Sequence, residues 1–552
     1  MIRAANNIAD SDCSESEWDW RQWSFAVSVT FLVILCFCGL EAPDVNESHY
    51  LTKAKHFWDV NWCSRDLFLE SASAHIAFFV CFGWMFETFS LTTGTWIGRL
   101  AVWALVAIAW SNLLRGFSVR VWATPLLASL WLVMIDRANL AGEWVVGGLE
   151  AKSVAYAFLL FAMSAALHER WGRFWILSGI ATLFHFLVGF WFVVAWLIGL
   201  SVRRLDRSGN NRRNLSIKPS KASLWALGVF CMLALAGAYP SLAADWGTDS
   251  GVRQLAAEVQ VRYRLVHHQL FAGFSTYRVA SFVSVIGVAL VLLRIAGHGR
   301  LQNLVKAFFI GSLFVAFLGL ILSAVVDSKS AGADYSISLL RLYWFRMADF
   351  AVPTSVVLLL GLLTIRIAHL ERIQRVIIYS SFSLLVLAFA MACIERQQSP
   401  GAPADVASLP PQPNPEKFSE LARNWIAVCD WVRENTPEDS LFICPADQQT
   451  FKWFAQRAEV VCWKDMPQDA KSVAVWWRRV QAIIQPQRTY SLGLMAFSDE
   501  QLRSLANSFG ADYIIVLQSQ YEQRPVKSGL ERVYPDEQSR RTSFVVLKTN
   551  RE

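Results

Sequence analysis

Long apolar runs recur between residues 23 and 394, and they constrain the fold more than any other feature of the chain. Each run approaches the roughly 20 residues that an α-helix needs to cross about 30 Å of hydrocarbon. Of the 552 residues, 54% are hydrophobic and 17% are charged, so a single soluble core would not bury this much apolar surface. The sequence therefore predicts a mainly α-helical, polytopic transmembrane bundle, because helices satisfy their own backbone polar groups in lipid.

About eleven crossings result when the short basic loops are assigned to the cytoplasmic side. Residues 73–91 are interpreted as an interfacial helix, because counting them as a span would put several basic loops outside. Residues 171–200 are interpreted as two short helices that meet near His185, a broken hairpin of the kind that lines a protein-enclosed cavity. The other expected spans are 23–40, 97–114, 121–135, 151–167, 224–244, 279–295, 304–326, 345–367 and 376–394.

An odd number of crossings separates the two ends of the chain. We expect a cytoplasmic tail at 1–21, a bundle at 22–394 with an external first loop at 41–96, a Pro-rich linker at 395–416, and an extracytoplasmic α/β domain at 417–552. Within that domain, hydrophobic periodicity predicts helices and parallel strands. The helices are expected at 418–435, 471–484 and 499–509, and the strands at 440–444, 459–463 and 512–517.

The segment after the first apolar run carries charged side chains at helical spacing. A helix there places Glu47 beside Tyr50 and puts His49, Lys53 and His56 on an adjacent stripe. A carboxylate next to a cationic strip suits a reaction in which a base activates an acceptor while positive groups hold a leaving phosphate. The alternative is a solvated interfacial helix with mixed charges.

A second polar segment, residues 143–152, contains Gly147 and Gly148 directly before Glu150. Glycines let a backbone approach a ligand closely. Glu143, Glu150 and Lys152 are therefore candidate binding residues. The alternative is a flexible loop with a charged helix start, where a glutamate is favoured by the helix dipole.

Ionisable residues also lie at the expected external ends of later runs. Arg341 and Arg346 offer planar donors for phosphate, and Asp349 either joins them or neutralises Arg346 in a structural pair. His267 and His268 are weaker binding candidates, because neighbours on a helix point apart and make a poor chelate. His185, at the apex of the hairpin, either reaches a cavity or is a structural histidine.

These segments resemble the GT-C class of membrane glycosyltransferases. The resemblance rests on the first-loop segment 44–50, which looks like an Asp-Glu-x-x-Tyr motif, on Arg99 near the start of the return span, on the broken hairpin and on the external domain. Residues 61–63, 143–152 and 341–349 also resemble an uncharacterised membrane family of planctomycetes and cyanobacteria.

The resemblance to GT-C enzymes implies a glycosyltransferase of the bacterial cytoplasmic membrane. Its donor would be a polyprenyl-phosphate-linked sugar, held by Arg341 and Arg346, and its acceptor a glycan, lipid or protein on the extracytoplasmic face. The catalytic carboxylate of the class maps onto Glu47, with Asp44 in reserve, although Asn46 stands where an aspartate often precedes that glutamate. The class includes metal-dependent and metal-free enzymes, so a divalent cation, Mg²⁺ or Mn²⁺, stays open.

Two other functions compete with glycosyl transfer. A transporter or flippase of lipid-linked or small polar substrates would also use broken helices and buried charges. A non-catalytic scaffold with the same fold would explain Asn46. The chain has no Walker-type phosphate loop, no HExxH and no GxSxG motif, which disfavours an ATP-driven pump or a common hydrolase. Membrane orientation accounts for the net charge of +7 without a nucleic-acid partner.

Overall fold

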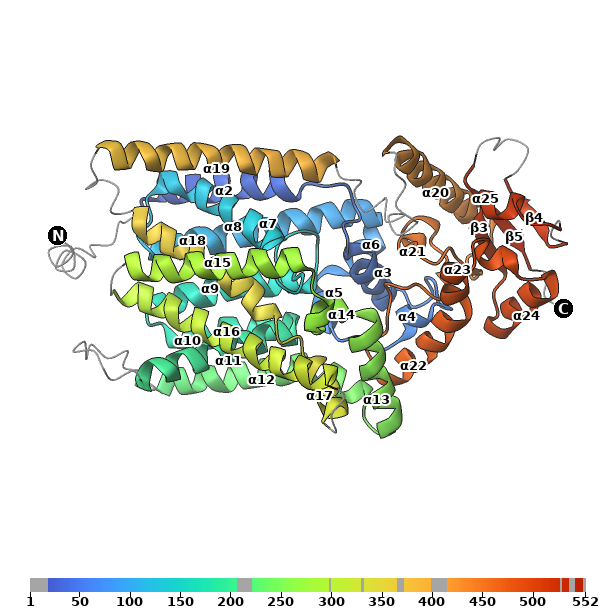
Figure 1. The fold of residues 1–552 in the computed structure, drawn as a ribbon, viewed down its shortest axis with the longest axis horizontal. Helices are drawn as coiled ribbons and strands as arrows, with labels where there is room; N and C mark the ends of the chain where they lie inside the picture. Colours follow the sequence, from blue (N-terminus) through green and yellow to red (C-terminus); the bar gives the residue numbers. More distant parts are fainter. Residues whose placement is uncertain are drawn as a thin grey trace.

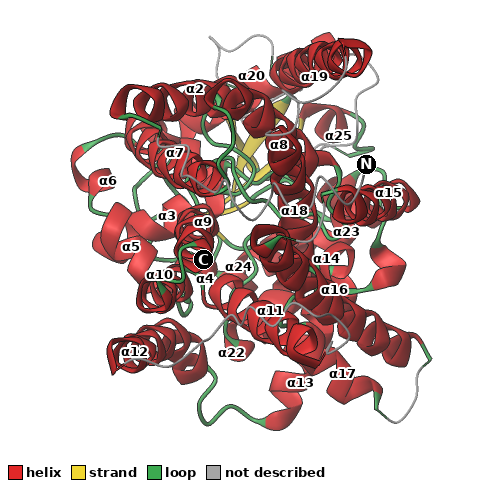
Figure 2. Ribbon diagram, turned by 90° about the vertical axis from the view of Figure 1, so that its left-hand side faces the viewer, coloured by secondary structure: helices red, strands yellow, loops and turns green. Residues whose placement is uncertain are grey.

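A computed structural model describes residues 18–205, 221–296, 299–328, 332–364, 372–398, 415–526, 529–535 and 542–549. Nearly all of the expected cytoplasmic tail, the basic loop at 206–220 and the Pro-rich linker at 399–414 lie outside these residues. Figure 1 shows a bundle of helices that run side by side, with a smaller domain of C-terminal residues attached at one end. Figure 2 looks along the bundle, whose helices pack around one another instead of forming one layer.

The bundle is formed mainly by long apolar helices. Seven helices of the described chain are long and apolar enough to cross a membrane, which indicates a multi-pass membrane protein. They are α2 (Trp20–Cys38), α7 (Leu91–Gly116), α11 (Phe186–Leu205), α12 (Lys221–Ala244), α15 (Thr276–Ile295), α16 (Arg300–Asp327) and α18 (Arg346–Thr364). The first of them begins at a capping box, in which the Asp19 and Gln22 side chains accept from each other's backbone amides at 2.7 and 3.1 Å.

Four further helices complete the bundle: α8 (Thr124–Arg137), α9 (Ala151–Leu167), α10 (Trp171–Phe184) and α19 (Arg372–Gln398). The first three have 14 to 17 residues. At 1.5 Å per residue they rise only about 21 to 26 Å. Eleven crossings therefore stay a prediction.

The stretch 73–91, expected to lie in the interface, is not one span-length helix. It contains α5 (Ile76–Phe82) and α6 (Met85–Thr88), separated by a turn. Seven residues of helix rise only about 10 Å. This confirms that the stretch is too broken to count as a straight span.

The break near His185 is confirmed, because His185 is the single non-helical residue between α10 and α11. The expectation of two short helices is wrong for α11, which has 20 residues and is long and apolar enough to span a membrane. The ring of Phe174 lies 5.8 Å from that of Phe192 and 5.9 Å from that of Trp196, so the two helices fold back on each other. Gly189 permits this close contact, since a Cβ there would lie 2.1 Å from the Thr182 hydroxyl oxygen.

Short helices cover the end of the bundle that faces the C-terminal domain (Figure 1). They come from the first loop and from two later loops of the bundle. They are α3 (Glu47–Trp58), α4 (Leu67–Glu70), α13 (Ser250–Glu258), a π-helical segment (Val259–Arg264), α14 (Val266–Gln269) and α17 (Ala333–Leu340).

The C-terminal domain contains a five-stranded mixed sheet in the order β2-β1-β3-β5-β4. The first three strands are parallel, as predicted, while β5 is antiparallel to both β3 and β4. These two antiparallel strands were not predicted. The strands are β1 (Leu441–Ile443), β2 (Ala458–Glu459), β3 (Tyr513–Leu517), β4 (Glu531–Tyr534) and β5 (Phe544–Lys548).

Helices flank this sheet, and those at 415–435, 470–484 and 499–509 match the expected positions closely. The shorter helices at 451–455, 485–489 and 518–522 were not expected. The expected strand at 459–463 is wrong beyond Glu459, because the chain there leaves the sheet and turns toward the bundle. Cys429, Cys444 and Cys462 are buried free thiols. The helices are α20 (Pro415–Asn435), α21 (Phe451–Ala455), α22 (Ala470–Arg479), a π-helical segment (Val480–Ile484), α23 (Gln485–Thr489), α24 (Asp499–Phe509) and α25 (Gln518–Glu522).

The first loop of the bundle docks the domain. Phe68 and Leu69 of α4 belong to the same buried apolar cluster as Trp476 of the domain. Arg65 donates to Asp512 Oδ2 at 2.7 Å and to the Asp439 carbonyl at 2.9 Å. The two parts are therefore joined by a shared core as well as by polar contacts.

Candidate functional site

The predicted catalytic carboxylate, Glu47, is fully buried in a saturated network. Arg99 of α7 donates from Nε to Oε1 at 2.7 Å and from Nη2 to Oε2 at 2.5 Å. The backbone amides of Leu149 and Asp44 donate to the same two oxygens at 2.7 and 2.6 Å. A carboxylate with four donors holds the first loop against α7 and the 143–150 loop, and both of its oxygens are already engaged.

Gly147 and Gly148 allow this network to form. A Cβ on Gly148 would lie 2.7 Å from Glu47 Oε1, and one on Gly147 would lie 2.0 Å from the Trp144 indole nitrogen. The expectation that these glycines admit a ligand is corrected accordingly. They let the loop pack against α3 and against its own tryptophan.

Asp44 and Glu150 are two carboxylates that are hydrogen-bonded less completely than Glu47. The Asn46 amide donates to Glu150 Oε1 at 3.1 Å, and Lys152 Nζ lies 3.3 Å from Oε2. Asp44 Oδ2 and Glu150 Oε2 are buried and have no hydrogen-bond partner among the described residues. Burial raises the pKa of Glu150 to about 6, with Lys152 opposing the rise and the charge of Asp44 adding to it.

Arg346, at the start of α18, lies beside Glu143 and His185 in the same region. Its Nε donates to Glu143 Oε2 at 2.8 Å, and its Nη1 lies 3.3 Å from His185 Nε2. The guanidinium carbon lies 4.1 Å from the centre of the Tyr343 ring, and the Tyr156 hydroxyl donates to Glu143 Oε1 at 3.1 Å. Arg346 is thus held in place by a buried carboxylate, with the apex of the hairpin beside it.

Asp349 holds a loop in place, and it neither joins a phosphate site with the arginines nor neutralises Arg346. Its carboxylate accepts from the backbone amides of Leu140, Ala141 and Glu143 at 2.6, 2.9 and 3.2 Å. Glu143, and not Asp349, therefore neutralises Arg346. The Asp349 side chain fixes the loop that carries Glu143.

Two histidines and a tyrosine complete what we call the polar cluster. The His75 ring lies 4.8 Å from the His185 ring and 5.3 Å from the Tyr50 ring. Nδ1 of both histidines is buried without a hydrogen-bond partner in the described part of the chain. Burial lowers the pKa of His75 to about 3, so this imidazole is neutral at physiological pH. The polar cluster consists of Asp44, Tyr50, His75, Glu143, Glu150, Lys152, His185, Tyr343 and Arg346.

The expected cationic strip on α3 does not form. His49 Nδ1 lies 2.9 Å from Asp465 of the domain, His56 Nδ1 lies 2.8 Å from the Trp62 carbonyl, and Lys53 donates to the Phe68 carbonyl at 2.6 Å. Burial lowers the pKa of Lys53 to about 7. The loop that contains α4 and the C-terminal domain cover the strip, so these side chains join the two parts of the molecule.

Arg341 and the histidine pair lie apart from the centre of the polar cluster. Arg341 donates to Gln260 of the π-helical segment at 3.0 Å. His268 contacts the Ala141 carbonyl at the margin of the cluster. The expectation that His267 and His268 point apart is wrong, since their ring centroids are 4.1 Å apart in the short helix α14.

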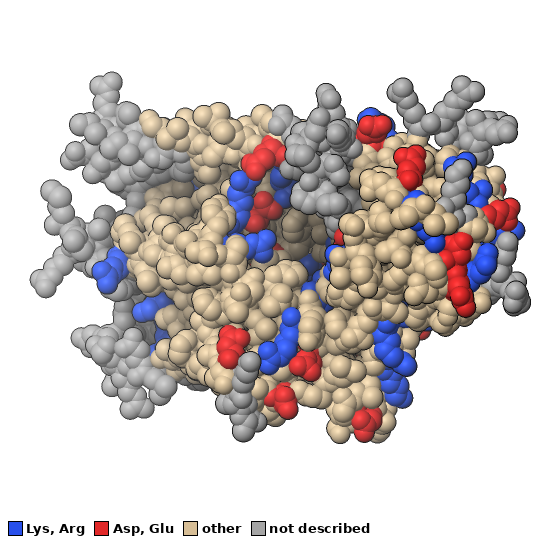
Figure 3. Space-filling model, turned by 45° about the vertical axis from the view of Figure 1, so that its right-hand side comes forward, with Lys and Arg blue, Asp and Glu red and all other residues tan. Residues whose placement is uncertain are grey.

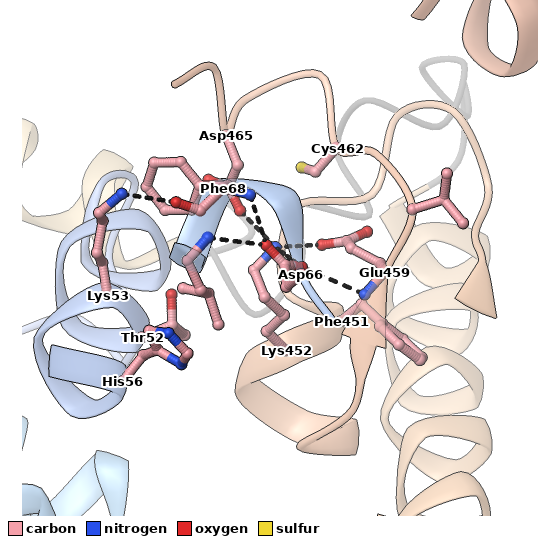
Figure 4. Close-up of polar contacts among 12 residues, drawn as sticks. Thr52, Lys53, His56, Asp66, Phe68, Phe451, Lys452, Glu459, Cys462 and Asp465 are labelled. Atoms are coloured by element: carbon pink, nitrogen blue, oxygen red, sulfur yellow. Dashed lines mark hydrogen bonds and ion pairs between the residues drawn. The ribbon is translucent and has the colours of Figure 1, made fainter. Parts of the chain in front are cut away.

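A second buried assembly, which we call the junction cluster, consists of Asp66, Lys452, Glu459 and Asp465 (Figure 4). Lys452 Nζ lies 3.2 Å from Asp66 Oδ2, 2.7 Å from Glu459 Oε1 and 2.7 Å from Asp465 Oδ2. Burial raises the pKa of Glu459 to about 7. Although burial opposes it, the Lys452 ammonium keeps the pKa of Asp465 well below its usual range.

The ligand atoms of Glu459, Cys462 and Asp465 lie within 4.8 Å of one another, which makes them a candidate metal site. Both carboxylates already contact the Lys452 ammonium, and burial raises the pKa of the Cys462 thiol, which disfavours the thiolate that a metal needs. This set therefore does not fit a metal ion. Mg²⁺ and Mn²⁺ prefer oxygen ligands, and the described residues of the polar cluster hold no comparable group of three.

Fold and site together define a multi-pass membrane protein in which a small α/β domain covers a buried polar cluster. Figure 3 shows a hollow in the surface between bundle and domain, with acidic and basic side chains around it. Residues 423–483 match the model of a domain of unknown function (DUF6798). This stretch includes Lys452, Glu459 and Asp465, so it contains the domain's half of the junction cluster. No curated protein sequence matches the chain.

Proposed function

We propose that the protein is a GT-C-type membrane glycosyltransferase that uses a polyprenyl-phosphate-linked sugar as donor. The observation that carries the proposal is the polar cluster, in which two incompletely hydrogen-bonded carboxylates, Asp44 and Glu150, lie in one buried region with Lys152 and Arg346. Sugar transfer from a lipid phosphate needs a base for the acceptor and positive charge for the leaving group.

Glu150 is the better candidate for the base. Its pKa of about 6 is close to physiological pH, where a base is both deprotonated and able to accept a proton. Asp44 would orient the acceptor or stabilise positive charge that develops on the sugar. Glu47, which the resemblance assigns as catalytic, acts as a positioning residue through Arg99.

Arg346 and Lys152 are proposed to hold the phosphate. Glu143 contacts Nε of Arg346 and His185 contacts its Nη1, which leaves three of the five guanidinium N–H donors for a phosphate oxygen. Neutral His75 and His185 would hydrogen-bond sugar hydroxyls through their unpaired nitrogens. In this proposal the chain crosses the bacterial cytoplasmic membrane eleven times, and the extracytoplasmic domain shapes the entrance for a glycan, lipid or protein acceptor.

The test is transfer by the full-length protein in proteoliposomes, with a radiolabelled polyprenyl-phosphate sugar on one side of the bilayer. We expect Glu150→Gln and Asp44→Asn each to lower the rate at least about a hundredfold, the lower range for loss of a general base. Arg341→Gln, which removes an arginine outside the polar cluster, should keep the wild-type rate. Equal rates for Glu150→Gln and wild type would contradict the assignment of the base.

The same vesicles separate the competing functions. The apex of the α10–α11 hairpin lies in the polar cluster, and this observation favours a transporter or flippase as the second candidate. Movement of the labelled lipid across the bilayer without transfer would support that function. The absence of both transfer and movement would support a non-catalytic scaffold. Transfer measured with and without EDTA decides whether Mg²⁺ or Mn²⁺ takes part.

A further inference from the structure

A cavity of about 380 Å³ opens where α7, α9 and α10 meet. It lies at the end of the bundle away from the C-terminal domain, since it is lined by the last turns of α7 and α9 (Figure 1). Its volume falls within the roughly 300 to 1,000 Å³ of small-molecule sites. The polar side chains that line it are Asn112, Arg115, Ser118, Ser164, His168, Arg170 and Arg173.

The charged side chains that line this cavity are all arginines. Three guanidinium groups line it, and none of the described lining residues is acidic. Arg115, Arg170 and Arg173 have no ion-pair partner within the described ranges of the chain. The neighbouring acid, Glu169, instead contacts Arg300, with 3.2 Å between the charged atoms. Positive charge therefore gathers in this concave site, and no acidic side chain of the described ranges pairs with it.

The first turn of α10 adds to this positive charge. Arg170 is the cap residue of this 14-residue helix, and its side chain does not cap the first turn. The N-terminus of a helix carries a partial positive charge and free N–H groups, which favour an anion. Arg170 and Arg173 of this turn both line the cavity, so two guanidinium groups and the positive end of the helix lie on one side of it.

The walls of the cavity are fixed by specific contacts. The Trp23 indole donates to Asn112 Oδ1 at 2.9 Å. Gly116 leaves room for His168, whose Nε2 would lie 3.2 Å from a Cβ at that glycine. Ser118 and Glu169, in the two turns that border the cavity, have φ angles of 55° and 54°, a region that non-glycine residues seldom adopt. Basic residues that only orient a chain in the bilayer need no such cavity.

We propose that this cavity binds a phosphate-bearing group, supplied either by the head group of an anionic phospholipid or by a soluble phosphate compound. Three arginines and a helix N-terminus match the charge and the hydrogen-bond acceptors of a phosphate. Phe161 and Leu177 give the cavity an apolar side that suits a lipid glycerol backbone. The site is separate from the polar cluster and does not depend on the proposed glycosyl transfer.

The test uses the full-length protein in nanodiscs. In the lipid arm, native mass spectrometry follows phosphatidylglycerol bound in discs of phosphatidylcholine with added phosphatidylglycerol. In the soluble arm, calorimetry follows inorganic pyrophosphate added to discs of phosphatidylcholine alone. We expect Arg170→Gln with Arg173→Gln to weaken binding in the responsive arm about tenfold or more, as for loss of charged hydrogen bonds.

Two further variants test whether the loss of binding is specific to the cavity. Arg294→Gln removes one exposed charge at the last turn of α15, outside the cavity lining, and should bind like the wild type. Ser164→Leu fills the cavity without changing charge and should also weaken binding. Equal binding by the double variant and wild type, an equal loss in Arg294→Gln, or no binding in either arm would overturn the proposal.

Discussion

The polar cluster and the junction cluster are both buried, both rich in charge and both at the same end of the bundle, yet they differ in how completely their groups are paired. In the junction cluster, all three carboxylates contact one ammonium, that of Lys452. In the polar cluster, a buried oxygen of Asp44 and one nitrogen each of His75 and His185 have no hydrogen-bond partner among the described residues, while Glu150 Oε2 lies 3.3 Å from the Lys152 ammonium. Because unpaired buried groups lower stability, we infer that the junction cluster holds the bundle and the domain together, and we propose the polar cluster as the ligand site.

Removal of the shared ammonium should have the largest effect. Lys452→Met leaves three buried carboxylates without their counter-charge, and such a loss typically costs about 3 to 5 kcal/mol. We expect a lower melting temperature and faster proteolysis between the bundle and the domain. Lys471→Met, on the exposed side of α22, is the matched control and should change stability by less than about 0.5 kcal/mol. Equal melting of the two variants would show that the junction cluster does not hold the domain.

Glu47→Gln tests whether this residue belongs with the stabilising pairs. The change weakens the buried fork with Arg99 and should destabilise the protein by about 3 kcal/mol. Glu41→Gln, an exposed carboxylate six residues earlier in the same loop, should melt like the wild type. If Glu47→Gln kept its melting temperature but lost transfer, Glu47 would be catalytic, and the division between the two kinds of cluster would need revision.

The pH dependence of the transfer rate should follow the deprotonation of Glu150. A base acts in its deprotonated form, so the rate should rise about tenfold per pH unit below pH 6 and level off above it. The rate that remains in Glu150→Gln should lack this rise. A wild-type profile that stays flat between pH 5 and 7 would exclude Glu150 as the base.

The smallest effect is expected outside both clusters. Arg341→Gln removes one side-chain hydrogen bond to Gln260, which is worth about 1 kcal/mol, and should leave transfer unchanged. Melting curves and the transfer assay together check this. A loss of transfer comparable with that of Arg346→Gln would extend the polar cluster to Arg341.

Much of the helical framework was predictable, because hydrophobic runs set it locally. The helices α9 and α24 begin and end at the expected residues, and His185 was expected at the break in the hairpin. The mixed sheet was harder, since β5 lies between β3 and β4 and is antiparallel to both. Their partners depend on tertiary contacts that a local pattern does not contain.

The candidate site could be predicted only in part. Glu143, Glu150, Lys152 and Arg346 stood out as charges at the ends of apolar runs, and the structure brings them together. Arg99 also stood out, as a charge within an apolar run, but the sequence did not predict its pairing with Glu47. The junction cluster gave no signal, because Asp66 and Lys452 come from segments nearly four hundred residues apart and form no motif.

The contact between Arg65 and Asp512 has a consequence for biosynthesis, since the two residues are separated by 447 positions in the chain. At about 5 to 20 residues per second, the ribosome needs roughly 20 to 90 seconds to make the second partner after the first. During that interval the loop around α4 has no domain to bury Phe68 and Leu69. A nascent chain stopped before Asp512 should therefore be a ready target for membrane proteases or chaperones.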